Sequence, residues 1–132
     1  MDKNYLINKA YEAQKFSYSP YSNFQVGAAL ITKSGKIYTG TNIESAAFSP
    51  TICAERTAFA KAVSEGEREF SAIAICGSDS DYCVPCGVCL QVMAEFAEPD
   101  TFLILSAKTR GDFMEYSLSQ LLPYGFKLRE EN

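Results

Sequence analysis

The sequence predicts a three-layer α/β/α domain, in which helices cover both faces of a mixed sheet of about five strands. Two observations lead to this fold class. The segments with helical and strand periodicity follow one another as a helix, a hairpin and then a helix–strand pair twice, an order typical of layered α/β domains. The chain has 132 residues, of which 47% are hydrophobic, and this suits one compact core. We therefore expect residues 1–132 to form a single domain.

The first third of the chain predicts a helix followed by a hairpin. Residues 2–17 carry apolar side chains at helical spacing, and the segment 17–24 is rich in turn-forming residues. Two β-prone runs, residues 25–33 and 36–42, then flank a Ser-Gly pair. Two such runs around a short turn indicate a pair of antiparallel strands.

The rest of the chain predicts alternating helices and strands. Ser49 and Pro50 form a helix-start signal with the serine as N-cap, so we expect a helix from 51 to 63. Pro85 indicates the start of another helix, which reaches residue 96. The other expected elements are strands at 70–76, 101–106 and 113–116 and a short helix at 117–122.

The charge and hydropathy of the chain argue against several classes of function. The formal net charge is -4, whereas proteins that bind nucleic-acid polymers usually present a basic face to the phosphates. No apolar stretch is long enough for a membrane span, and the N-terminal residues lack the apolar core of a signal peptide. We therefore expect a cytoplasmic protein, with neither a nucleic-acid polymer nor a membrane as partner.

Three of the five cysteines are placed to hold one metal ion. Cys53 lies just inside one predicted helix start, and Cys86 and Cys89 form a C-x-x-C pair just inside another. Free N–H groups and the helix dipole stabilise thiolates at such positions. Zinc with three protein ligands keeps its fourth position for water, which is the catalytic arrangement. Because the chain has no histidine, a His-ligated metal and a Ser-His triad are excluded.

Two residues next to Cys53 complete a candidate catalytic site. Glu55 is placed to contact a water on the metal, and so to carry protons between this water and a substrate. Three thiolates would leave the zinc complex with a net negative charge, and we expect Arg56 to temper it by reaching a ligand sulfur. Cys-x-Glu followed by Pro-Cys-x-x-Cys is the spacing of zinc deaminases that act on nucleobases.

The two remaining cysteines leave a structural alternative open. Cys83 extends the C-x-x-C pair to C-x-x-C-x-x-C, so four cysteines could close a structural zinc site or hold an iron–sulfur cluster. This alternative leaves Glu55 without a role. Cys76 lies in an apolar strand and is most simply a small buried hydrophobic residue.

Further sequence blocks carry a resemblance that covers most of the chain. They are YSPYSNFQVGAAL (18–30), GKIYTGTNIE (35–44), TICAERTAFAKAVSEG (51–66), PCGVCLQVMAEF (85–96) and LLPYGF (121–126). Together they resemble the small, homotetrameric cytidine deaminases. The resemblance implies a cytidine-deaminase-like catalytic domain with Zn2+ as cofactor. It also implies hydrolysis of cytidine and 2′-deoxycytidine to uridine and 2′-deoxyuridine plus ammonia, in pyrimidine salvage.

The same resemblance implies roles for residues outside the metal motif. Phe24 would pack against the pyrimidine ring, and Asn42 and Glu44 would bind the ribose hydroxyls. Ala54 would offer backbone contacts to the base. Phe126 would lie near an active site, which could be that of a neighbouring subunit. Without the resemblance, Phe24 and Phe126 would be interpreted as core residues.

Three positions depart from the family pattern and keep other substrates open. Ser45 stands where the family usually has Asn, Phe48 where it has Tyr, and Leu90 where it has Arg. These departures motivate a second hypothesis, a deaminase of another aminopyrimidine nucleoside such as blasticidin S. Cytosine editing in RNA or DNA is a third hypothesis, which the acidic charge opposes. A structural metal-binding module is the non-enzyme alternative.

Overall fold

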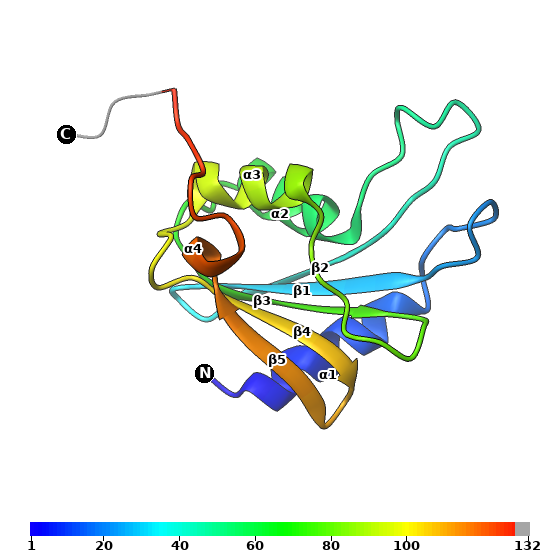
Figure 1. Ribbon diagram of the computed structural model, residues 1–132, viewed down its shortest axis with the longest axis horizontal. Helices are drawn as coiled ribbons and strands as arrows, with labels where there is room; N and C mark the ends of the chain where they lie inside the picture. The colour runs from blue at the N-terminus through cyan, green and yellow to red at the C-terminus, as the bar shows by residue number, and fades with distance from the viewer. Residues whose placement is uncertain (129–132) are drawn as a thin grey trace.

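Five strands form one mixed sheet in the order β2-β1-β3-β4-β5 (Figure 1). The computed structural model describes residues 1–128, so the last four residues of the expected domain lie outside the described part. The strands are β1 (Val26–Thr32), β2 (Ile37–Thr41), β3 (Phe70–Gly77), β4 (Leu103–Thr109) and β5 (Asp112–Ser117). Strands β3 and β4 run parallel, and the other neighbouring pairs run antiparallel. The expected mixed sheet is confirmed.

Helices cover both faces of this sheet, so the expected three layers are confirmed. Helix α1 (Lys3–Gln14) lies on one face, while α2 (Ala54–Ser64), α3 (Gly87–Phe96) and the short α4 (Leu118–Leu121) lie on the other (Figure 1). Alternate side chains of a strand point to opposite faces. In β1, accordingly, Ala29 belongs to the core under α1, whereas Ala28 and Leu30 belong to the core under α2 and α3. None of the described helices combines the length and the hydropathy needed to cross a bilayer.

Two glycines allow the helices to approach the sheet closely. A Cβ atom on Gly27 would lie 2.1 Å from the carbonyl oxygen of Ala10 in α1. A Cβ atom on Gly40 would lie 2.4 Å from the carbonyl oxygen of Ala54, the first residue of α2. Such distances are far below van der Waals contact, so only glycine fits there. Gly40 thereby brings the N-terminal end of α2, with Cys53 and Glu55, onto strand β2.

The expected start of α2 is wrong by several residues. Ser49 does not cap the helix, because residues 46–50 form turns and Ile52 then forms an isolated antiparallel bridge with Ile43. The amide of Ile43 donates to the carbonyl of Ile52 over 2.9 Å, and the reverse bond measures 3.0 Å. The helix begins at Ala54, and Cys53 is its N-cap residue with extended φ and ψ of -75° and 154°. A pairing between residues nine positions apart therefore overrides the local Ser-Pro signal.

The other elements match the expected order, with shifted ends. Helix α1 is shorter than the predicted stretch and begins after Asp2, whose side chain accepts a hydrogen bond from the amide of Tyr5. Helix α3 begins at Gly87, so Cys86 rather than Pro85 stands at its N-terminal boundary. The last helix, α4, begins with a capping box between Ser117 and Gln120.

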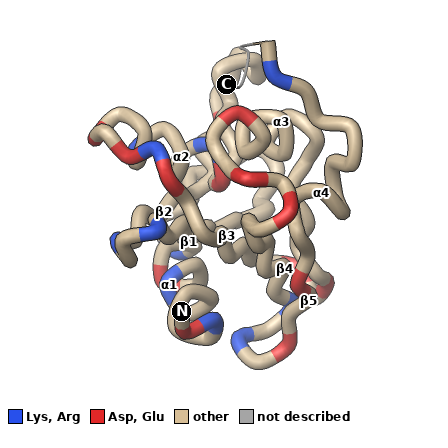
Figure 2. The backbone as a smooth tube through the Cα atoms, turned by 90° about the vertical axis from the view of Figure 1, so that its left-hand side faces the viewer, with Lys and Arg blue, Asp and Glu red and all other residues tan. Residues whose placement is uncertain are grey.

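The charged residues are interleaved over the surface. Figure 2 shows Lys and Arg along α1, near α2, at the β4–β5 turn and near the C-terminal end, with Asp and Glu between them. This distribution differs from the continuous basic face that polymeric nucleic acid requires.

Candidate active site

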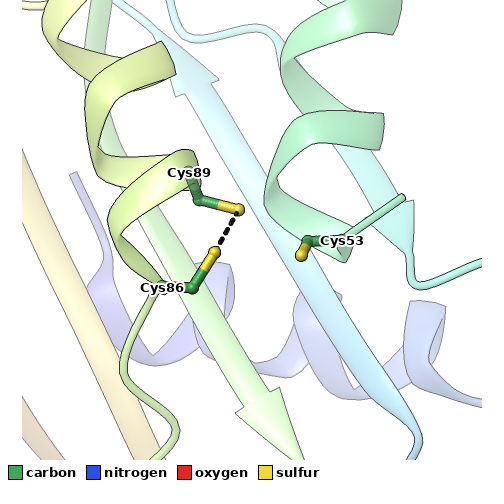
Figure 3. A group of neighbouring side chains, drawn as sticks. All are labelled: Cys53, Cys86 and Cys89. Atoms are coloured by element: carbon green, nitrogen blue, oxygen red, sulfur yellow. Dashed lines mark hydrogen bonds between the residues drawn. The ribbon is translucent and has the colours of Figure 1, made fainter. Parts of the chain in front are cut away.

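Three cysteine sulfurs meet at the N-terminal ends of α2 and α3 (Figure 3). Cys53 is the N-cap of α2, Cys86 is the N-cap of α3, and Cys89 lies in the first turn of α3. The three Sγ atoms lie within 4.8 Å of one another, and the Sγ atoms of Cys86 and Cys89 are 3.6 Å apart. Sulfurs that share one tetrahedral zinc at ~2.3 Å are about 3.8 Å apart. The cluster therefore fits a zinc ion with three protein ligands.

The N-cap position of two of these cysteines differs from the expected one and suits metal binding. Both residues have extended backbones, and neither side chain caps a backbone N–H group of its own helix. No backbone N–H group therefore competes with a metal for either sulfur, while the unpaired N–H groups of each first turn create a positive potential beside them.

The electrostatics around Cys53 favour its thiolate. A hydrogen bond from the Cys89 thiol, together with the Arg56 guanidinium, lowers the pKa of Cys53 to about 5. The Nη2 atom of Arg56 donates to the Cys53 Sγ over 3.3 Å. The shared proton raises the pKa of Cys89 in turn, and burial acts in the same direction. Metal binding would release this proton, as usual for thiolate ligands.

Glu55 is a buried carboxyl in the first turn of α2. Its side chain is 5% exposed, and burial is the main reason that its pKa is raised to about 7. The neighbouring Cys53 thiolate raises the pKa further. Buried carboxyls with perturbed pKa values beside a metal site are typical of general acid–base catalysts.

Cys83 and Cys76 lie apart from the sulfur cluster. Among the described residues, the grouping that could hold a metal contains Cys53, Cys86 and Cys89, without a fourth cysteine. Cys83 is half-buried beside Gly77, and burial raises its pKa to about 12. Cys76 is fully buried in the core under α1, on the opposite face of the sheet. A structural site with four thiolates is therefore not formed.

The ring of Phe24 rests on the end of strand β3. A Cβ atom on Gly77 would lie 2.6 Å from the Phe24 Cζ, so the glycine makes room for the ring. Phe24 is half-buried and packs against the core cluster that also contacts Cys53 and Cys83. The ring thus lies on the same side of the sheet as the sulfurs, where a flat substrate could stack on it.

The Asn42 side chain is largely occupied by the protein itself. Its Oδ1 accepts hydrogen bonds from the Ser17 hydroxyl and, over 2.9 Å, from the amide of Val26. Its Nδ2 donates to the carbonyl oxygen of Phe24 over 2.7 Å. An amide nitrogen carries two protons, so one N–H of Asn42 remains for a ligand.

Glu44 is held by the turn-rich segment that precedes β1. Its Oε1 accepts from the amides of Tyr21 and Ser22 over 2.9 and 3.2 Å, and its Oε2 accepts from the Ser22 hydroxyl. The hydroxyl bond, followed by the two amide bonds, lowers the pKa of Glu44. The carboxylate borders a depression of about 400 Å³, which is lined by Tyr21, Ser22, Glu44, Ser45, Phe48 and Thr51. No sequence motif singled out Ser22, and its place in the turn-rich segment was the one available signal.

Ala54 and Phe126 lie in different surroundings. Ala54 is fully buried as the first residue of α2, next to Cys53. Phe126 is 63% exposed and lies on the outer surface of α3 with Val88, while its carbonyl accepts from Gln91 over 2.7 Å. It does not line the depression that contains Glu44.

The fold and the sulfur cluster define a class of zinc-binding catalytic domain. Three thiols at two helix N-termini leave one zinc position open, and a buried carboxyl lies beside them. The model of the family described as the cytidine and deoxycytidylate deaminase zinc-binding region matches residues 1–105. The chain belongs to this family. The family is one of zinc-binding proteins, and the cluster supplies ligands for that zinc.

Individual proteins support this membership over the full length. The chain is 46% identical to a cytidine deaminase of Halalkalibacterium halodurans over 132 residues, covering 100% of this chain and 99% of the relative. The crystal structure of cytidine deaminase from Burkholderia pseudomallei superposes with a TM-score of 0.90 at 42% identity, covering 96% of this chain and 100% of that one. A blasticidin-S deaminase of Bacillus cereus is 31% identical over an alignment of 106 positions that covers 74% of each chain.

Proposed function

We propose that this chain is a zinc-dependent enzyme that hydrolyses cytidine and 2′-deoxycytidine to uridine and 2′-deoxyuridine plus ammonia, as a step of pyrimidine salvage. The observation that carries this proposal is the cluster of three sulfurs beside the buried Glu55. The full-length identity of 46% to a cytidine deaminase supports the choice of substrate. The interleaved surface charges favour a free nucleoside over a nucleic-acid polymer.

In this proposal Cys53, Cys86 and Cys89 hold the zinc. When bound, zinc supplies a Lewis acid that activates a water molecule for attack on C4 of the cytosine ring. Arg56 draws negative charge from the Cys53 sulfur through its 3.3 Å hydrogen bond. This contact reduces the electron density that the three thiolates would otherwise place on the metal.

Glu55 moves the protons in this scheme. Its carboxylate accepts a proton from the attacking water and delivers it to N3 of the ring. The same carboxyl then transfers the second proton of the water to the amino group that leaves C4 as ammonia. Burial keeps bulk water away, which strengthens the contact between the carboxyl group and the ring.

The remaining candidate residues bind the nucleoside. Phe24 would stack on the base, and the backbone of Ala54 would bond to its polar edge. The free N–H of Asn42 would donate to a sugar hydroxyl, and Glu44 would accept from one. Because Phe126 is exposed on α3, away from the Glu44 depression, we propose that it serves a neighbouring subunit of a homotetramer. We further propose that residues 1–132 are one catalytic domain and that the enzyme is cytoplasmic.

A second candidate is deamination of another aminopyrimidine nucleoside, such as blasticidin S. Two observations favour it: the relative of that name, and the sugar-side position of Phe48, whose ring is 73% exposed and has no hydroxyl to offer. Both candidates use the same metal site and the same proton carrier, so they differ only in the substrate.

The test is the ultraviolet-monitored turnover of cytidine by the purified, zinc-loaded protein, with Glu55→Gln beside it. We expect rapid loss of cytidine absorbance with the wild type and none with the variant at equal zinc content. A wild type that binds zinc but leaves cytidine and 2′-deoxycytidine unchanged would refute the substrate assignment. Blasticidin S is then the next substrate. Full activity of Glu55→Gln would instead refute the role of the carboxyl group.

A further inference from the structure

The Ser22 hydroxyl connects two segments that bear the proposed substrate contacts. It donates a hydrogen bond to the Oε2 of Glu44, which follows strand β2, and accepts one from the amide of Phe24 over 3.0 Å. The direction of both bonds is determined by chemistry, because an amide only donates, a carboxylate only accepts and a hydroxyl has one proton. One side chain therefore joins the carboxylate of Glu44 to the backbone of Phe24.

These bonds leave little freedom to the Glu44 carboxylate. Its Oε1 accepts two amide protons, from Tyr21 and Ser22, and so uses both of its lone-pair directions. Its Oε2 accepts the Ser22 hydroxyl, which leaves one direction for an external donor. The carboxylate can thus accept one hydrogen bond from a ligand, in an orientation that Ser22 determines.

We propose that Ser22 is a positioning residue for the nucleoside, which acts by aiming the free side of the Glu44 Oε2 at a sugar hydroxyl. This inference rests on the proposed function, since it requires that Glu44 bind the sugar. Ser22 itself does not touch the reacting atoms. The Ser22 oxygen also accepts from the Phe24 amide. The hydroxyl therefore helps to keep a constant distance between the carboxylate proposed to bind the sugar and the residue proposed to stack on the base.

Loss of the hydroxyl should therefore weaken binding of the sugar more than it affects the chemical step. In Ser22→Ala the amide bonds to the Oε1 remain, but the Oε2 loses its only described protein partner and is free to turn. A hydrogen bond to a charged group is worth enough for a roughly tenfold change in affinity. We expect KM for cytidine to rise about tenfold, with kcat changed less than about threefold.

The experiment compares three variants on two ligands. Ser22→Ala removes the hydroxyl, and Ser22→Thr keeps it at this exposed position. Ser64→Ala is the matched control, because the exposed Ser64 bonds to the carbonyl of Lys61 at the end of α2. The ligands are cytidine as substrate and 2′,3′-dideoxycytidine, which lacks the 2′- and 3′-hydroxyls and is measured as a competitive inhibitor of cytidine turnover.

Support would be an elevated KM in Ser22→Ala, near-wild-type KM in Ser22→Thr and Ser64→Ala, and an inhibition constant of the dideoxy compound that changes less than about threefold. An unchanged KM in an active protein would overturn the inference and leave the proposed function standing. An equal loss for both ligands, or a fall in kcat alone, would also overturn it, since the loop as a whole would then be the cause. A wild type inactive on cytidine would refute the proposed function, and the inference with it.

Discussion

Arg56 donates a hydrogen bond from its Nη2 to the Sγ of Cys53 over 3.3 Å. The two residues are separated by three positions, so one turn of α2 brings the guanidinium back to the N-cap sulfur. Cys53 is the one cysteine of the cluster that α2 contributes, while the other two come from α3. The contact therefore acts on the sulfur through which α2 would bind the proposed zinc ion.

Replacing Arg56 with Gln should lower kcat while zinc remains bound. Without the cationic donor, the Cys53 thiolate gives more electron density to the metal, which then activates water less. Loss of a hydrogen-bond partner of a metal ligand typically lowers metal affinity or activity ten- to a hundredfold. We expect kcat to fall about tenfold. The measurements are zinc content by mass spectrometry and steady-state kinetics. Arg68→Gln, which removes contacts to the carbonyls of Val63 near the C-terminal end of α2 and of Glu67, is the control. Equal kcat in wild type and Arg56→Gln would contradict the role.

The variants Cys86→Ala and Cys83→Ala should distinguish a zinc ligand from a cysteine that does not bind the metal. The Cys86 sulfur lies in the cluster, so its loss should reduce zinc below one ion per chain and abolish turnover. Cys83 is outside the cluster, so its variant should retain zinc and most of the activity. Zinc titration under matched buffer conditions measures the metal binding of both variants, and cytidine turnover measures their activity. Loss of zinc in Cys83→Ala would revive the structural site with four thiolates.

Gly77→Ala should disturb the base site without touching the metal. The added Cβ would lie 2.6 Å from the Phe24 Cζ, so the ring must move. We expect KM for cytidine to rise about tenfold, because small displacements of positioning groups are costly. Gly111→Ala is the matched control, since a Cβ there meets nothing within 4 Å. If both variants behave alike, the ring of Phe24 does not position the base.

The free energy of unfolding should decrease at alkaline pH partly through Cys76. Burial raises its pKa to about 12, whereas the thiol of an unfolded chain has a pKa of ~8.5. The folded state thus keeps a proton that the unfolded chain releases. The contribution of this thiol to the free energy of unfolding is therefore present below pH ~8.5 and is lost as pH rises toward the pKa of the folded state. Urea unfolding at pH 8 and pH 10 should show a smaller decrease for Cys76→Ala than for wild type. Equal decreases would disprove the contribution of this thiol.

Deoxycytidine should be a far better substrate than its 5′-monophosphate. The depression next to Glu44 is lined by a carboxylate and uncharged side chains, and no Lys or Arg is among its described lining residues. A phosphate group would meet a negative charge without a counterion, which disfavours binding. We expect kcat/KM to be at least about tenfold lower for the nucleotide, measured by ammonia release. Comparable values for both compounds would show that another part of the protein receives the phosphate.

Much of the fold and the metal site could be predicted from local patterns. The hairpin around Gly35, the buried strand β3 and the capped α4 follow from features that act within a few residues. The same holds for the metal motif. Cys86 and Cys89 are one helical turn apart, so they share a helix end whatever the rest of the chain does. Arg56 could be assigned to a ligand sulfur for the same reason.

The sequence by itself thus indicated Cys53, Cys86 and Cys89 as candidate metal ligands, and it determined the order of the helices and strands. Only the tertiary structure decided where α2 begins, because the Ile43–Ile52 bridge connects segments whose pairing no local signal announces. It also decided that Asn42 has a single N–H to spare and that Ser22 holds Glu44, 22 positions away. The physical reason is that a side chain's remaining hydrogen-bonding capacity depends on its spatial neighbours, and the packing of the sheet and helices selects those.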